Sequence, residues 1–118
     1  MVAVAGEGMR AEIALHWRVM PDYGAVKGTF NQYAWDGGTT VRFVYAGHTA
    51  DGKVHSTWEI DTILINDDGQ ITHWEFWNDT HGADDIIYTV TGKHLIGLTM
   101  QQYGQLIQDT AKADAKAP

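Results

Sequence analysis

The sequence predicts an α+β fold, in which a few helices accompany one antiparallel sheet. Four segments rich in β-branched and aromatic residues follow one another, separated by short turns. An amphipathic helical pattern precedes them, and a second one follows. Because antiparallel strands can be joined by tight hairpins whereas parallel strands need long crossovers, short turns favour an antiparallel meander.

The first predicted element is a helix over residues 9–20. Its apolar positions Ile13, Trp17 and Met20 recur at the spacing of one helical face. Pro21 ends it, since proline disfavours helical geometry in the residue before it.

The predicted strands are residues 25–35, 39–46, 54–65 and 70–78. The turns between them are Asp36-Gly37-Gly38, Ala50-Asp51-Gly52 and Asp68-Gly69. Aspartate-glycine pairs supply the positive φ that tight hairpin turns require.

The part of the chain after Asp79 has a different character. We expect a loop over residues 80–85, a short extra strand over 86–90 and a helix over about 99–113. Thr99 followed by Gln102 has the spacing of a capping box at the start of this helix. We find no internal repeat or linker, so residues 1–118 are interpreted as a single domain.

Composition narrows the classes of partner. The chain has no cysteine and a formal net charge of −7, so a disulfide framework and thiolate metal sites are excluded. Such an acidic surface repels phosphate groups, and we expect neither nucleic-acid nor membrane partners. No stretch has the roughly 20 apolar residues of a membrane span. We expect a cytoplasmic protein without a metal or other cofactor, since phosphate-loop and metal-ligand motifs are lacking.

The hairpin formed by the last two predicted strands fixes which side chains share a face. A two-residue turn at Asp67-Asp68 or Asp68-Gly69 gives the same assignment in either register, because side chains alternate along a strand. One face holds Glu59, Asp61, Ile63, Trp74, Phe76 and Asn78, and the other holds Trp58, Ile60 and Trp77. Both faces are half apolar, so we expect both to be substantially covered. The first has the mixed lining of a ligand cavity; the second is either core or a subunit interface.

The order of several short motifs resembles the nuclear-transport-factor-two-like superfamily, in particular its SnoaL-like and ketosteroid-isomerase-like branches. The motifs are Pro21-Asp22, Gly47-His48-Thr49, Asp61, Asp68-Gly69-Gln70-Ile71 and Trp77-Asn78-Asp79. The resemblance covers residues 9–79, with a shortened N-terminal part before them and an extension over 80–118. It implies a curved sheet wrapped into a cone, with helices closing a pocket. It also implies that the final helix covers the cone mouth of its own subunit or of a partner.

The same resemblance places Asp61 where ketosteroid isomerases have the aspartic acid of their oxyanion hole. It places Trp74, Phe76 and Asn78 in the cavity lining. The family's general base and oxyanion tyrosine precede the matched segment, so no base for that reaction is visible. Burial in an apolar pocket disfavours the charged form of a carboxyl group, which can then donate to a developing oxyanion.

These expectations define two functions. The first is isomerase, cyclase or dehydratase-type acid-base chemistry on an apolar carbonyl-like or polyketide-like compound, with Asp61 as the catalytic acid. The alternative is non-catalytic binding of a small apolar ligand, with Asp61 as a structural acid. The expected pocket residues are Glu59, Trp74, Phe76, Asn78, Tyr45, Phe43 and Ile63. Trp58, Trp77 and Ile60 are the expected interface of a homo-oligomer, a dimer or larger.

Overall fold

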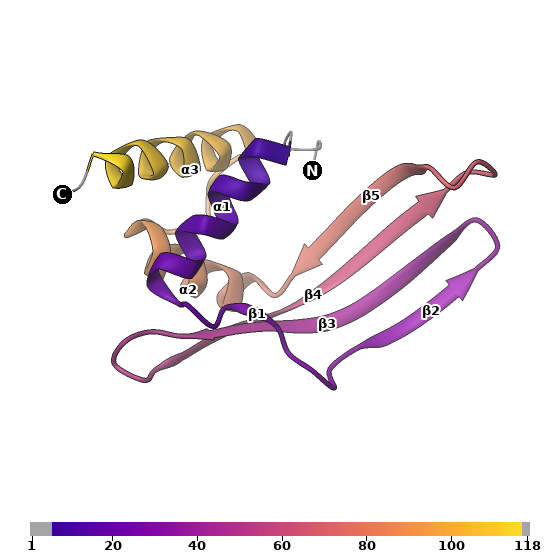
Figure 1. The fold of residues 1–118 in the computed structure, drawn as a ribbon, viewed down its shortest axis with the longest axis horizontal. Helices are drawn as coiled ribbons and strands as arrows, with labels where there is room; N and C mark the ends of the chain where they lie inside the picture. The colour runs from indigo at the N-terminus through magenta and orange to yellow at the C-terminus, as the bar shows by residue number, and fades with distance from the viewer. Residues whose placement is uncertain (1–5, 117–118) are drawn as a thin grey trace.

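The computed structural model describes residues 6–116, which form an α+β fold (Figure 1). Its elements in chain order are α1 (Gly6–Val19), β1 (Gly24–Ala25), β2 (Asn31–Trp35), β3 (Gly38–His48), β4 (Val54–Ile65), β5 (Ile71–Asn78), α2 (Thr80–Thr91) and α3 (Met100–Ala115). The strands form one antiparallel sheet in the order β1-β3-β4-β5, and β2 pairs with β3 on the same side as β1. The sheet is curved but not closed, so β5 is one edge and β1 with β2 is the other.

The helices gather over one end of the sheet (Figure 1). Gly47 on β3 allows α1 and the loop after it to come close, because a Cβ there would lie 2.9 Å from the Cβ of Met20. Gly82 on α2 likewise approaches the backbone oxygen of Ser56 on β4. The apolar core lies at this end and consists of Leu15, Met20, Phe43, Ile86, Ile87 and Ile107.

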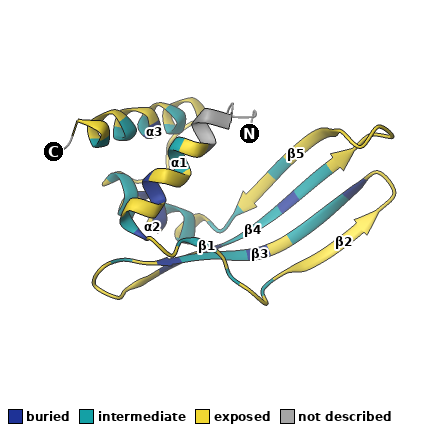
Figure 2. Ribbon diagram, in the orientation of Figure 1, coloured by how far each residue is buried: buried dark blue, intermediate teal, exposed yellow. Residues whose placement is uncertain are grey.

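The far end of the sheet is exposed, as the yellow segments of β2 and β5 in Figure 2 show. Tyr33 is 72 % exposed and Ile71, at the start of β5, is 56 % exposed. The chain exposes 8139 Å², whereas a compact monomer of this length exposes about 6,400 Å². Its radius of gyration is 15.4 Å, against about 13.5 Å for a compact domain.

Most predicted elements are confirmed. The first helix, the strand over 54–65 and the strand ending at Asn78 agree closely with α1, β4 and β5. The expected strand over 25–35 is wrong as one element, because β1 and β2 are separate. Gly28 has a φ of 85° between them, and the Thr29 hydroxyl accepts a hydrogen bond from the backbone N–H of Val44 at 3.0 Å.

The expected loop and short strand after Asp79 are also wrong, since this segment is helix α2. The Asp79 side chain caps the helix by accepting from the Gly82 N–H, and Gly92 ends it in the left-handed conformation. Ile86 and Ile87 are buried in the core. A short apolar run has no periodicity that distinguishes a buried strand from a buried helix, and here packing against β4 selects the helix.

The final helix is confirmed as α3, and both hydrogen bonds of its capping box are present. It packs against α1, where Arg18 pairs with Asp114 at 2.8 Å. The Tyr103 hydroxyl of α3 donates to the Glu12 side chain of α1. The final helix therefore lies on α1 and α2, and α2 packs against β4 (Figure 1). No helix within residues 6–116 combines the length and apolarity needed to cross a membrane.

Candidate functional site

The observed register of β4 and β5 confirms the predicted face assignment. Asp61 pairs with Phe76, and Ile63 pairs with Trp74. Glu59 pairs with Asn78. All of these side chains therefore lie on one face, which is the concave face that the helices approach.

Strand β3 completes this face. Phe43 lies opposite Glu59, and Tyr45 lies opposite Thr57. The rings of Phe43 and Tyr45 meet edge to face, with centroids 5.0 Å apart. The structure thus brings the predicted catalytic acid and the predicted pocket residues together on one surface.

Asp61 is 5 % exposed although it carries a carboxyl group. Its Oδ2 accepts a hydrogen bond from the Trp74 indole N–H at 3.2 Å. Its Oδ1 is buried, and it has no hydrogen-bond partner among the residues that the structure describes. A buried acceptor without a donor costs about 1–3 kcal/mol, so this oxygen requires a proton from a neighbouring group.

Glu59 is the neighbouring group that carries such a proton in its protonated form. Burial raises the pKa of Glu59 to about 8, and the adjacent Asp61 side chain adds to the shift through hydrogen bonding and charge repulsion. The Asn78 amide donates to Glu59 Oε1 at 3.2 Å. These effects favour the protonated form of Glu59, whose side chain lies beside Asp61 on the same face. A carboxyl group with a raised pKa can act as an acid or a base near neutral pH.

Two tyrosines lie beside this carboxyl pair. Burial raises the pKa of Tyr45, and the charges of Glu59 and Asp61 raise it further. The ring of Tyr23 stacks on Tyr45, with centroids 5.5 Å apart and planes inclined by 14°. Tyr23 was not predicted, because it follows the helix in a loop where neither helical nor strand periodicity applies.

The potential around the pair is negative. Glu12 on α1 adds a repulsion that also raises the pKa of Glu59. No ion pair formed by the described side chains includes Glu59 or Asp61. Because no described cation pairs with Glu59, its negative neighbours favour its protonated form.

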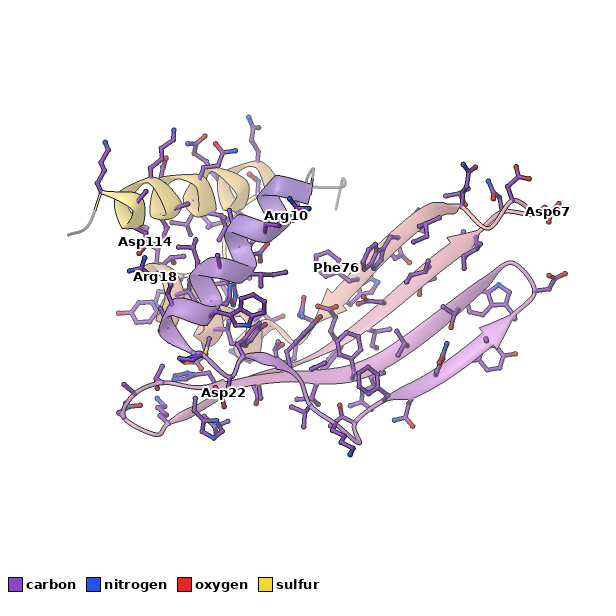
Figure 3. All side chains as sticks on the ribbon, in the orientation of Figure 1. Arg10, Arg18, Asp22, Asp67, Phe76 and Asp114 are labelled. Carbon is purple, nitrogen blue, oxygen red and sulfur yellow. The ribbon has the colours of Figure 1, made fainter. Side chains whose placement is uncertain are left out.

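The aromatic walls of the site are only partly covered. Trp74 is 44 % exposed and Phe76 is 37 % exposed, and Figure 3 shows Phe76 on the stretch of β5 beyond the helices. The expectation that both faces are substantially covered is therefore wrong for this stretch. The helices cover the Tyr45 end of the concave face and leave the Trp74 end open.

Two of the motifs that carry the family resemblance contact each other. Asp22 Oδ1 accepts from the His48 backbone N–H at 2.7 Å, and Asp22 Oδ2 lies 2.6 Å from His48 Nδ1. These bonds from His48 lower the pKa of Asp22. The contact fixes the loop after α1 against the end of β3, and it thereby positions Tyr23 over Tyr45.

The predicted interface residues lie together on the convex face. Ile60 pairs with Trp77 on β5 and with Arg42 on β3. The Arg42 guanidinium lies 5.8 Å from the ring centroid of Trp58. No described helix packs on this face, so it is not core.

His55 takes part in a separate cluster. It shares the face of Glu59 and Asp61, but its buried ring is held by Asp85 on α2, with Nδ1 2.6 Å from Oδ2. Its Nε2 lies 3.2 Å from Thr49 Oγ1, which donates to Asp51 at 2.5 Å. Because the hydroxyl proton is used there, this Thr-His-Asp series clamps the β3–β4 turn to α2 and does not activate a nucleophile.

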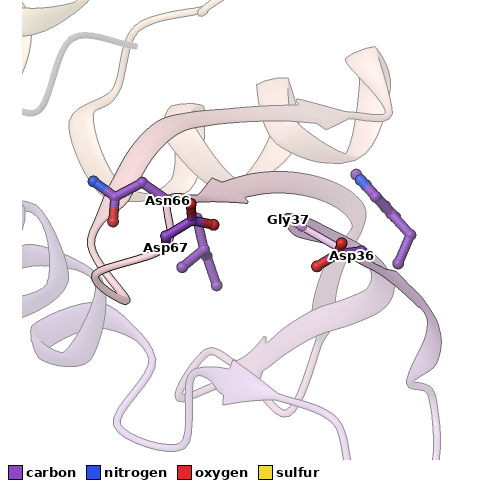
Figure 4. A pocket seen from close by; sticks show the side chains of 7 residues that line it. Asp36, Gly37, Asn66 and Asp67 are labelled. Atoms are coloured by element: carbon purple, nitrogen blue, oxygen red, sulfur yellow. The ribbon is translucent and has the colours of Figure 1, made fainter.

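Two surface hollows lie away from the carboxyl pair. One of about 370 Å³ separates the β2–β3 and β4–β5 turns (Figure 4) and is lined by Trp35, Asp36, Gly37, Gly38, Ile65, Asn66 and Asp67. The other, of about 390 Å³, lies along α3 and is lined by Lys93, His94, Leu98, Gln102, Gln105, Leu106 and Asp109. None of the predicted pocket residues lines either hollow.

Together these features define an open α+β protein whose helices cover one end of a curved sheet, with a proton-holding carboxyl pair where the covered and open parts of the concave face meet. No protein-family model matches this chain, and no curated protein or solved structure resembles it significantly.

Proposed function

We propose that this protein binds a small apolar carbonyl-like or polyketide-like compound on its concave face and acts on it by isomerase, cyclase or dehydratase-type acid-base chemistry. The proposal includes membership of the nuclear-transport-factor-two-like superfamily and a cone-shaped pocket floored by this face. The supporting observation is the unpaired, buried Oδ1 of Asp61 beside protonated Glu59.

The chemistry follows from the shared proton. When a carbonyl compound loses a proton from its α-carbon, negative charge develops on the carbonyl oxygen. A protonated carboxyl group in a poorly solvated site stabilises this charge by donating a hydrogen bond. In this proposal Glu59 donates its proton to the carbonyl oxygen, and Asp61 accepts the proton that leaves the α-carbon, so the acid role expected of Asp61 passes to Glu59.

The alternative is non-catalytic binding, in which the same proton holds a ligand carbonyl. The exposed walls favour this alternative, because Trp74 and Phe76 admit a ligand without excluding water. Acid-base catalysis gains from water exclusion, since electrostatic interactions are stronger in a dry site.

Cyclohexanone is a suitable probe for both functions. Exchange of its α-hydrogens in D₂O, followed by NMR, measures proton transfer. The indole N–H resonance of Trp74 measures binding, because this group donates to Asp61. Catalysis predicts exchange above the buffer rate, and it predicts a loss of about 100-fold in Glu59→Gln with the Trp74 shift retained.

The matched control is Glu75→Gln, which changes the same functional group on the convex face. It should leave both readouts unchanged. A Trp74 shift without exchange would establish the binding alternative. Absence of both signals with cyclohexanone, and with a longer apolar ketone, would overturn the proposed site.

A further inference from the structure

Strand β5 exposes a free hydrogen-bonding edge. The Asp79 N–H donates to the Trp58 carbonyl at 3.3 Å, so this residue pair directs its backbone groups into the β4–β5 ladder. Inward and outward groups alternate along an antiparallel strand. His73 and Glu75 therefore bond towards β4, whereas Trp74, Phe76 and Asn78 direct their N–H and C=O groups outwards.

This edge, formed by Ile71–Asn78, lacks proline and lysine, two residues that usually prevent strands from pairing. Its register with β4 is regular up to a shift between Leu64 and Ile65. Ile71 is 56 % exposed and Trp77 is 63 % exposed. A long apolar edge of this kind is a template for another strand.

The sequence of β5 is complementary to itself. If Trp74 lies opposite the partner's Trp74, then Thr72 lies opposite the partner's Phe76. Trp74 and Phe76 have outward backbone groups, so Trp74 forms the central hydrogen-bonded pair of the new ladder. In the same register His73 lies opposite the partner's Glu75, and Ile71 lies opposite the partner's Trp77.

Each pair in this register is favourable. His73 and Glu75 occupy non-hydrogen-bonded positions, where facing side chains come closest. Both are about half exposed, and within one chain their nearest charged atoms are 3.5 Å apart. Aromatic and aliphatic partners fill the other positions, and cross-strand pairs of these kinds contribute about 0.2–1 kcal/mol each.

We propose that two copies of this chain pair through their β5 edges, antiparallel and centred on Trp74, to form one continuous sheet. The two-fold axis passes through the sheet, so the concave faces of both copies lie on the same side. The chain exposes about 1,700 Å² more surface than a compact monomer. A typical specific interface buries about 800 Å² per partner, which this excess accommodates.

Cysteine pairing tests the register directly, because the chain has no cysteine of its own. In the proposed pairing position 73 faces the partner's position 75, with Cα atoms about 4.5 Å apart. Like positions are about 8 Å apart, beyond the roughly 7 Å that a disulfide spans. Under mild oxidation, His73→Cys mixed with Glu75→Cys should therefore form disulfide-linked dimers, and each variant alone should not.

Charge reversal tests the same contact without a covalent bond. His73→Glu places two acidic groups opposite each other in each half of the interface, and we expect the dimer Kd from sedimentation to rise about tenfold. Adding Glu75→His restores the pair and should restore the native Kd. Gln32→Glu on the opposite edge strand β2 should have no effect, and circular dichroism confirms folding of each variant.

A chain that stays monomeric at a concentration of about 1 mM, where even weak dimers form, would overturn the proposal. So would cross-linking by either cysteine variant alone, since it indicates a different register. A dimer that is insensitive to His73→Glu but weakened by Trp58→Ala would assign the interface to the convex face instead.

Discussion

The two ends of the sheet differ in how their apolar side chains are used. At the helical end Met20 is fully buried and Ile86 is 2 % exposed. At the open end Tyr33 and Ile71 are mostly exposed, although both side chains are largely apolar. The helical end therefore supplies the stability of the single chain, while the open end is available for a ligand or another chain.

The largest expected effect compares one buried with one exposed side chain. Ile86→Ala should lower the free energy of unfolding by about 2–5 kcal/mol, because it leaves a cavity between α2 and β4. Tyr33→Ala should lower it by less than about 1 kcal/mol, since only a solvated ring is lost. Urea unfolding at low protein concentration measures both. Equal losses would contradict the division into a stabilising and an open end.

Two glycines sharpen the comparison within the helical end. Gly47→Ala should lower the free energy of unfolding by about 1–3 kcal/mol through overpacking, because its Cβ would press on Met20. Gly104→Ala should raise it by up to about 1 kcal/mol through better helix propensity, because a Cβ there meets nothing within 4 Å. Thermal unfolding of the two variants should give Tm shifts of opposite sign.

The smallest expected effect is a pH dependence of the free energy of unfolding caused by Glu59, which lies where the two ends of the sheet meet. The unfolded chain releases the Glu59 proton from about pH 4.5, whereas the folded chain keeps it until about pH 8. The folded state binds more protons in this window, so the free energy of unfolding falls as the pH rises from 4.5 to 8. This contribution is fully present below pH 4.5 and is lost above pH 8.

Glu59→Gln should remove this pH dependence. The amide of the variant is a hydrogen-bond donor that does not ionise. At pH 9 the free energy of unfolding of the variant should therefore exceed that of the native chain by at least about 1 kcal/mol. Near pH 4 the variant and the native chain should have the same free energy of unfolding. Glu75→Gln, a change at a half-exposed side chain, should leave the native pH profile intact. A native profile in Glu59→Gln would show that the proton is not held at this position.

The sequence by itself determined the local features. Strand alternation and the Asp68-Gly69 turn were enough to assign Asp61, Trp74 and Phe76 to one face, because register and side-chain direction depend on neighbours along the chain. The Thr99 capping box and the Pro21 stop likewise act within a few residues. The paired motifs Pro-Asp and Gly-His-Thr were recognisable, although their contact with each other was not.

Only the tertiary structure decided the remainder. Ile86 and Ile87 lie in a helix because β4 offers them a surface, and no local pattern specifies that surface. Glu59 has a raised pKa because elements distant in the sequence bury it, and Glu12 from helix α1 adds a smaller repulsion. The exposure of Trp77 depends on which elements reach the sheet. Burial and electrostatic potential are sums over distant parts of the chain, whereas periodicity, caps and turns are properties of adjacent residues.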